Sequence, residues 1–336
     1  MRSIRLIPAA APAVLGTLAV HLWLAAPATA LAQPGAVFPS KPVRIIVPFA
    51  PGGQSDIISR VVGQKLSEQW GQPMVYENRG GAGGTLGIDA MLRSPADGYA
   101  IGAGSQSALS IAQHLYAKLP YDPLKEVQGV VTLVLTPYAV AVNARVPVKN
   151  VADLVKLARS KNGLLNYGSS GSGSISHLAV ELFGAAANAQ LVHVPYKGTA
   201  PALAGLATGE IDLMFSDLTP LGPHVESGRA RVIAIAGSRR SSAAQGVSTI
   251  AEQGFQMQPI DGRYGFVVPS GTPREVVNRI NAASVAALKM ADVRNRFETQ
   301  LGYAIVGDTP DDYQRAIRSD SEAFGKVIKR LGIKAE

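Results

Sequence analysis

Two glycine-rich segments stand out as places where the chain could hold an anion. The first, PFAPGGQSD at residues 48–56, follows the apolar run 43–47. The second, NYGSSGSGS at residues 166–174, precedes an apolar helical pattern that begins near Ile175. Each segment offers free backbone N–H groups and small hydroxyls at the start of an expected helix, where the helix dipole is positive. Two such loops in different halves of the chain predict one ligand held from both sides.

In the first half of the chain, the candidate ligand-binding residues lie in the first loop and at the end of an expected strand at 100–104. The candidate ligand contacts there are Phe49, Gly52, Gly53, Gln54, Ser55, Asp56, Ser105 and Gln106. A tight turn with positive φ is the structural alternative for the glycines. Asp56 is equally well explained as a first-turn acid that complements the helix dipole or orders the loop. Ser105 and Gln106 end a strand on the side where α/β sheets bind ligands.

The second loop is harder to explain as a plain connector, because four hydroxyls and three glycines lie between an expected buried strand and an amphipathic helix. Its candidate ligand contacts are Ser169, Ser170, Gly171, Ser172, Gly173 and Ser174. A third glycine-rich stretch, 80–84, lacks the last glycine of a dinucleotide-binding loop, because Leu86 stands at that position. We interpret it as a tight turn.

The elements that must position these loops alternate between short apolar strands and helices, which is typical of an α/β fold. Apolar residues three and four apart predict a helix from Ser55 to Trp70, ended by Gly71. Thr272 and Thr309, each followed by proline, are predicted to cap the helices that come after them. Pro137, within an apolar stretch at 130–142, and the stretch 259–265 are the predicted crossings between two lobes.

The predicted organisation is a first lobe of residues 33–138 plus 262–336 and a second lobe of residues 139–261. Residues 1–32 are predicted to be a Sec-type signal peptide, because Arg2 and Arg5 precede an apolar run and small residues end it at Ala32. A protein cleaved there and lacking cysteine is expected in the periplasm.

Composition argues against several other classes of protein. Loss of the two arginines would lower the net charge from +8 to +6 (8 − 2 = 6), but the basic residues are not interleaved with aromatics, as nucleic-acid binding would require. We find no nucleophile elbow, no phosphate-binding Gly-Lys-Ser/Thr loop and no zinc-binding histidine pair. Four of the five histidines lie outside residues 1–32, and they form no metal-ligand pattern: His114, His177, His193 and His224. No catalytic residue, metal or cofactor is therefore expected.

Several motifs in this chain follow one another in the order found in a known family. They are PVRIIVPFAPGG at 42–53, ENR at 77–79, SPADGY at 94–99, LNYGSSG at 165–171, HVPYKG at 193–198, GEIDLMF at 209–215 and GTP at 271–273. Together they resemble the Bug-type (Bordetella uptake gene) substrate-binding proteins of tripartite tricarboxylate transporters. The resemblance covers essentially the whole chain after Ala32.

The resemblance implies a type II periplasmic-binding-protein fold that closes over a small organic acid and delivers it to the membrane permease subunits. It adds Tyr196, Lys197, Gly198, Ser216 and Asp217 as further candidate contacts in the second lobe. It also implies a monomer without a cofactor. Two alternatives stay open: a receptor that signals to a histidine kinase, and an exported α/β enzyme. The identity of the acid is not readable from these motifs, although the scarcity of aromatics in the loops favours an aliphatic one.

Overall fold

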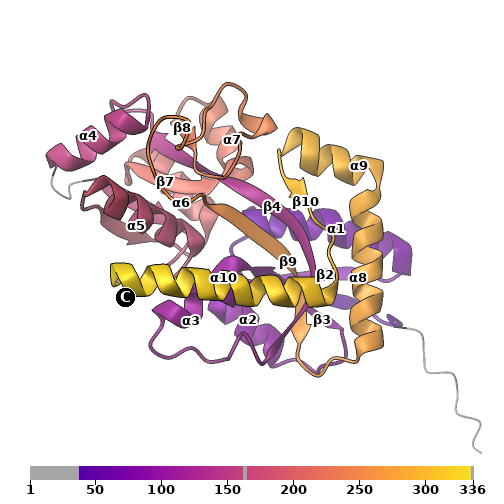
Figure 1. The fold of residues 1–336 in the computed structure, drawn as a ribbon. Helices are drawn as coiled ribbons and strands as arrows, with labels where there is room; N and C mark the ends of the chain where they lie inside the picture. The colour runs from indigo at the N-terminus through magenta and orange to yellow at the C-terminus, as the bar shows by residue number, and fades with distance from the viewer. Residues whose placement is uncertain (1–37, 162–164, 334–336) are drawn as a thin grey trace, which may run out of the picture. The chain divides into compact units, whose positions relative to one another are not determined.

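A computed structural model of the chain describes residues 38–161 and 165–333 (Figure 1). The described chain alternates strands and helices, as the sequence pattern predicts. The predicted signal peptide and its cleavage site lie outside the described residues. None of the described helices combines the length and the apolar character that a bilayer crossing needs.

The N-terminal part of the fold places two loops at one edge of a parallel sheet. Its elements are β1 (Val43–Val47), α1 (Gln54–Trp70), β2 (Met74–Asn78), the turn η1 (Ala82–Gly84), α2 (Thr85–Leu92) and β3 (Ala100–Ser105). Both β2 and β3 run parallel to β1. The segments that follow β1 and β3 therefore leave the sheet at the same edge, which is where open α/β sheets bind ligands.

A single long strand, β4 (Val127–Asn143), joins the two halves of the fold. Up to Pro137 it pairs antiparallel with β9 (Asp261–Pro269), which also pairs with β3. From Tyr138 onward it pairs with β7 (Leu213–Asp217) and β8 (Ala230–Ile235). The strand is continuous through Pro137, so the proline marks the change of partners and does not end the strand.

The second half repeats the arrangement of strand, loop and helix. It contains α4 (Val151–Lys161), β5 (Asn166–Ser169), α5 (Ile175–Ala187), β6 (Val192–Pro195), α6 (Thr199–Thr208), α7 (Leu218–Glu226) and the turn η3 (Ser242–Ala244). β5 runs parallel to both β6 and β7. The second glycine-rich loop therefore leaves the carboxyl end of β5, as the first leaves that of β1.

The remaining elements connect the halves and complete the C-terminus. They are η2 (Ser107–Ile111), α3 (Ala112–Leu115), α8 (Arg274–Lys289), α9 (Ala291–Arg294), η4 (Asn295–Gln300), β10 (Ala304–Ile305) and α10 (Pro310–Leu331). The predicted cap of α10 is confirmed, because the Thr309 hydroxyl accepts the Asp312 N–H at 3.2 Å. The predicted Thr272 cap is wrong: that hydroxyl donates to the Pro269 carbonyl at 2.8 Å, and Pro273 occupies the N-cap of α8.

The C-terminal helix α10 packs against the cores of both halves (Figure 1). Near its start, Tyr313 and Ile317 belong to a cluster with Ile46 of β1. Near its end, Phe324 and Ile328 belong to a different cluster, which includes residues of α5, β5 and β7. The sequence interpretation assigned all C-terminal helices to the first lobe, whereas the last turns of α10 contact the core of the second half. The lobe boundaries themselves stay a prediction.

Candidate functional site

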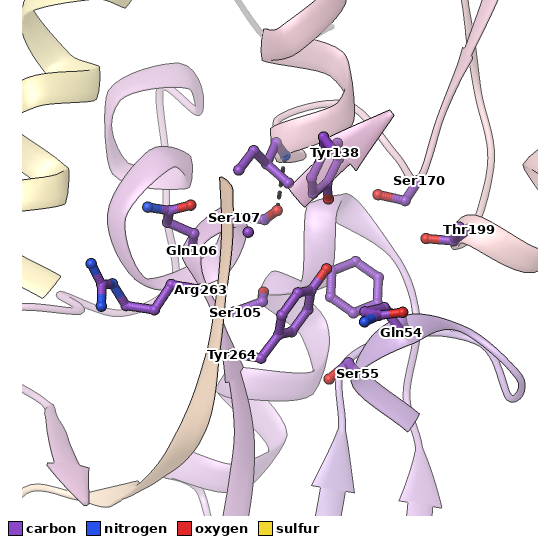
Figure 2. Close-up of a pocket in the computed structure, with 13 residues that line it drawn as sticks. Gln54, Ser55, Ser105, Gln106, Ser107, Tyr138, Ser170, Thr199, Arg263 and Tyr264 are labelled. Atoms are coloured by element: carbon purple, nitrogen blue, oxygen red, sulfur yellow. Dashed lines mark hydrogen bonds between the residues drawn. The ribbon is translucent and has the colours of Figure 1, made fainter. Parts of the chain in front are cut away.

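A small pocket lies where the loops of the two halves meet (Figure 2). The lining side chains come from the loop after β1, the end of β3, the β4 and β9 strands, and the starts of α5 and α6. The lining residues are Phe49, Gln54, Ser55, Ser105, Gln106, Ser107, Tyr138, Ser170, Ile175, Thr199, Gly262, Arg263 and Tyr264.

The start of α1 presents unpaired polar groups to this pocket. The N-cap of this 17-residue helix is Gly53, which supplies no side-chain hydrogen bond. Its first-turn N–H groups have no acceptor within the helix, and the positive end of the helix dipole lies there. Gln54 and Ser55 are 2% and 3% exposed, yet both amide atoms of Gln54 and the Ser55 hydroxyl have no partner in the described part of the chain. Buried polar atoms without partners are rare, so a ligand that supplies the partners is expected here.

The end of β3 adds two more unpaired atoms. The buried Ser105 hydroxyl and the Gln106 side-chain oxygen Oε1 have no hydrogen-bond partner among the described residues. The amide nitrogen Nε2 of Gln106 donates to Asp320 Oδ2 of α10 at 2.7 Å. Both residues were predicted from their place at the end of a strand.

On the opposite side, α6 contributes a second helix start without a side-chain cap. This ten-residue helix begins at Thr199, which lines the pocket, and its N-cap Gly198 supplies no side-chain hydrogen bond. Figure 2 shows Thr199 and Ser170 facing Gln54 across the pocket. The geometry therefore places two positive helix ends, one from each half, at the same pocket.

Most hydroxyls of the second glycine-rich loop bond within the loop or to its neighbours. Ser170 Oγ lies 3.1 Å from Ser176 Oγ, and Ser174 Oγ accepts the His177 N–H at 3.2 Å as the N-cap of α5. Ser169 Oγ lies 2.6 Å from His193 Nε2. Of the six residues predicted in this loop, only Ser170 lines the pocket, and the others shape the loop around it.

Contacts across the pocket hold the loops of the two halves together. Ser107, at the start of η2, accepts the backbone N–H of Ile175 through its hydroxyl at 2.9 Å. The Tyr116 hydroxyl donates to the carbonyl of Ser172. These two hydrogen bonds join the segment after β3 to the start of α5, so the pocket is enclosed on that side.

Asp56 orders the first loop and does not line the pocket. Its carboxylate accepts the Gly52 N–H at 3.0 Å, Arg60 Nε at 2.9 Å and Asn78 Nδ2 at 3.0 Å. Burial raises the pKa of this carboxyl, but these hydrogen bonds outweigh burial, and the net pKa lies below the usual value. The carboxylate charge is thus balanced by Arg60, away from the pocket.

Asp217 lies where three strands meet, and it also falls outside the lining. It is 1% exposed, and its carboxylate accepts hydrogen bonds from Thr136 of β4 and, at 3.0 Å, from the Tyr264 hydroxyl of β9. Burial raises the pKa of Asp217 to about 6, although these two donors act in the opposite direction. The residue is therefore part of the junction between the two halves.

The remaining predicted residues do not line the pocket either. Gly198 and the backbone of Lys197 pack against Ala50 and Gly80, so these loops touch across the two halves. The full set of predicted residues outside the lining is Gly52, Gly53, Asp56, Ser169, Gly171, Ser172, Gly173, Ser174, Tyr196, Lys197, Gly198, Ser216 and Asp217. Their contact with a ligand stays a prediction.

Sequence reasoning missed seven lining residues, namely Ser107, Tyr138, Ile175, Thr199, Gly262, Arg263 and Tyr264. Thr199 could have been found, because it follows a glycine and begins an apolar helical pattern, as Gln54 does. Tyr138, Arg263 and Tyr264 lie on the strands that cross between the halves, and nothing in their local sequence indicates which face of the strand meets a ligand.

The stacked histidines of the second half, His177 and His193, do not line the pocket. The rings of His177 and His193 stack at 4.1 Å, and Tyr167 stacks on His193 at 4.9 Å. Burial, together with His193, lowers the pKa of His177 to about 3, so this ring is neutral at physiological pH. Across the described ranges, no three His, Cys, Asp or Glu side chains gather as metal ligands.

The two-lobe α/β fold and the enclosed polar pocket define a solute-binding protein. The family model described as "Tripartite tricarboxylate transporter family receptor" matches residues 58–333. The protein BugT of Bordetella pertussis is 30% identical over 323 residues, which cover 96% of this chain and 97% of BugT. This chain belongs to the tripartite tricarboxylate transporter receptor family and is of the Bug type.

Two solved structures show how close the fold is to that of other solute-binding proteins. The R. palustris protein Rpa4515, solved with adipate, is 32% identical and superposes with a TM-score of 0.85, covering 88% of this chain and 99% of that protein. MatC of Rhodopseudomonas palustris, solved with bound malate, is 30% identical with a TM-score of 0.81, covering 87% and 100%. Adipate and malate are both small carboxylic acids.

Proposed function

We propose that this protein is a periplasmic receptor that binds a small organic acid in the pocket between its two lobes. One observation carries the proposal: the described residues leave five buried polar atoms of Gln54, Ser55, Ser105 and Gln106 unpaired, all on side chains that line this one pocket. Two helix starts without side-chain caps face the same space. The acids held by the two solved relatives support the ligand class.

The carboxylate is expected to lie at the start of α1. There it would accept the first-turn N–H groups and the hydroxyls of Ser55 and Ser105, with the start of α6 and Thr199 on the opposite side. The anion is stabilised by helix dipoles and neutral donors, so no unpaired lysine or arginine is needed. The proposed lobes are 33–138 plus 262–336 and 139–261. Binding that bridges the lobes would favour their closed arrangement by its greater affinity for that arrangement.

The proposed physiological role is delivery of the bound acid to the membrane permease of a tripartite transporter by a monomeric receptor. Membership of the receptor family and the signal-like N-terminal sequence support this role and the periplasmic location. The exported protein is expected to begin after Ala32.

A thermal-shift screen tests the binding proposal. The purified protein is heated with small carboxylates and, as matched controls, with the amides of the same skeletons. A ligand at 100 times its Kd adds about 2.7 kcal/mol. For a chain of about 300 residues this corresponds to a rise in Tm of roughly 4 °C. Stabilisation by an acid and not by its amide is expected, and no response to any acid by folded, ligand-free protein would contradict the proposal.

A further inference from the structure

A buried carboxylate contacts the pocket through the hydroxyl of a lining tyrosine. Asp217 is 1% exposed, and its Oδ2 accepts the Tyr264 hydroxyl at 3.0 Å. Its Oδ1 accepts the Thr136 hydroxyl. Tyr138 lies opposite Asp217 in the antiparallel pair of β4 and β7. Both tyrosines line the pocket (Figure 2), so one hydroxyl group separates the Asp217 carboxylate from the ligand site.

Neutral groups, and not a cation, balance this carboxylate. Within the described ranges, the side chains that donate hydrogen bonds to Asp217 are the hydroxyls of Thr136 and Tyr264. Arg263 follows Gly262 and precedes Tyr264 on β9, so it lies on the other face of the strand, and it pairs with Asp320 at 2.8 Å. A buried carboxylate with only hydroxyl donors is held less strongly in its charged form than one beside a cation.

The other groups that face Asp217 are tyrosines, which keep their own protons. Burial and the charge of Asp217 raise the pKa values of Tyr138 and Tyr264 well above the usual value. They also raise the pKa of Tyr303, which lies next to β10. Burial raises the pKa of Asp217 to about 6. The group of this cluster that gains or loses a proton near neutral pH is therefore Asp217.

The charge of Asp217 decides what the Tyr264 hydroxyl can offer to a ligand. A tyrosine hydroxyl has one hydrogen and can also accept, whereas an ionised carboxylate only accepts. While Asp217 is ionised, the single hydrogen of Tyr264 is committed to Oδ2. When Oδ2 takes up a proton from solvent, the carboxyl group becomes the donor to the Tyr264 oxygen. The hydrogen of Tyr264 is then free to turn into the pocket and donate to a bound anion.

Resting on the proposed function, we infer that the Tyr264 hydroxyl donates to the bound carboxylate, and that Asp217 is the positioning residue that frees this donor when it carries a proton. The receptor therefore takes up a proton as it binds the anion. The same proton removes a buried negative charge near the anion, so the gain needs no lysine or arginine. The inference concerns one carboxylate group and holds for acids that carry one such group or two.

Calorimetric titration with the acid that gives the largest thermal shift tests the uptake of a proton. The affinity is expected to be constant below about pH 6 and to fall by about tenfold by about pH 8, because the free receptor loses the proton in this range. Ordinary carboxylic acids, with a pKa of about 4, stay ionised throughout it. Titrations at about pH 6.5 in buffers with different heats of ionisation should show uptake of about half a proton.

The result also separates this inference from the proposed function. Equal affinity across the range, without proton uptake, would overturn the inference and leave the receptor function standing. Binding of no acid at any pH would overturn both.

Two variants assign the proton and the donor to their residues. Asp217→Asn imitates the protonated state, because its oxygen can accept from Thr136 while its N–H donates to Tyr264. It should bind without proton uptake and, at about pH 8, about tenfold more tightly than the parent, which a loss of structure would not produce. Tyr264→Phe keeps the ring and removes the donor, so at about pH 5.5 it should bind about tenfold more weakly than the parent. Full affinity of Tyr264→Phe at that pH would overturn the role of the hydroxyl.

Asp212→Asn is the matched control, because it makes the same change of charge just before β7 and outside the pocket lining. The Asp212 carboxylate accepts the Asn166 N–H at 2.8 Å, and an asparagine oxygen can accept it as well. The control should keep the proton uptake and the pH dependence of the parent. If Asp212→Asn loses the uptake as Asp217→Asn does, or if Asp217→Asn keeps the pH dependence of the parent, the assigned role of Asp217 is overturned.

Discussion

At the scale of single residues, the pocket is built from hydroxyl and amide groups that the folded chain leaves unpaired. Ser55 and Ser59 lie one turn apart on α1, and both are buried. Ser59 donates its hydroxyl to the Ser55 carbonyl at 2.7 Å, whereas the Ser55 hydroxyl has no partner in the described structure. The two serines are therefore expected to serve different purposes, one in binding and the other in stability.

Replacement of Ser55 by alanine is expected to weaken acid binding by about fivefold to tenfold, because one hydrogen bond to the carboxylate is lost. The free energy of unfolding of the unliganded protein should change by less than about 0.5 kcal/mol, because no internal hydrogen bond is broken. Isothermal titration and urea unfolding measure the two quantities.

Ser59→Ala provides the reverse pattern as a control. It should lower the free energy of unfolding by about 1 kcal/mol and leave the affinity nearly unchanged. Equal effects of the two substitutions on affinity would contradict the assignment of Ser55 to the ligand.

At the scale of elements, Asp217 joins the three strands that connect the halves. It lies at the end of β7 and accepts hydrogen bonds from Thr136 of β4 and Tyr264 of β9. Burial raises its pKa to about 6, above the ordinary value of an aspartate. Because the folded state holds this proton more tightly than the unfolded state, stability falls as the pH rises from about 4 to about 6.

The titration of Asp217 predicts that the free energy of unfolding depends on pH more strongly in the parent protein than in Asp217→Asn, because the asparagine does not ionise. Between pH 5 and pH 7 the parent should lose about 1 kcal/mol more of its free energy of unfolding than the variant does. Urea unfolding at the two pH values provides the comparison, and all other titrating groups cancel in the difference. Parallel pH dependence of the two proteins would show that Asp217 titrates at the same pH in both states.

At the scale of the whole molecule, the halves meet through their glycine-rich loops. Gly83 of η1 has a φ of +63°, and a Cβ there would lie 2.8 Å from the Ser172 carbonyl oxygen. Gly71, at the end of α1, has the same φ of +63° but nothing within 4 Å of its Cβ position. The two glycines therefore share the backbone strain that a side chain would introduce, and they differ only in the contact between the halves.

Gly83→Ala is expected to oppose closure and to weaken ligand binding by about tenfold or more, because its clash is with backbone of the other half. Both Gly83→Ala and Gly71→Ala should lower the free energy of unfolding by about 1 kcal/mol through the strained φ. Titration with an acid that stabilises the protein in the thermal-shift screen, together with urea unfolding, separates the effects. Equal affinities of the two variants would mean that the approach of these loops does not contribute to binding.

Local sequence patterns were sufficient to predict those elements that depend on interactions between residues close together in the chain. Helix α1 follows from the spacing of its apolar residues, and it ends at Gly71 because glycine readily adopts the left-handed conformation. The cap at Thr309 follows from a hydroxyl placed near the free N–H groups of a helix start. The Thr272 cap was wrong although its sequence is similar, because the Pro269 carbonyl competes for that hydroxyl. A hydroxyl bonds whichever partner the tertiary structure brings near, and sequence spacing alone does not identify that partner.

The sequence by itself determined the alternation of strands and helices, the two glycine-rich loops and the resemblance to a receptor family, because these depend on residues close together in the chain. Tertiary structure alone decided which polar atoms remain unpaired. Gln106 meets Asp320 across 214 residues, and Ser107 meets Ile175 across 68. Such distant partners decide how an amide is oriented and whether a hydroxyl is already hydrogen-bonded within the protein. The set of polar groups available to a ligand is therefore determined only when the two halves fold against each other.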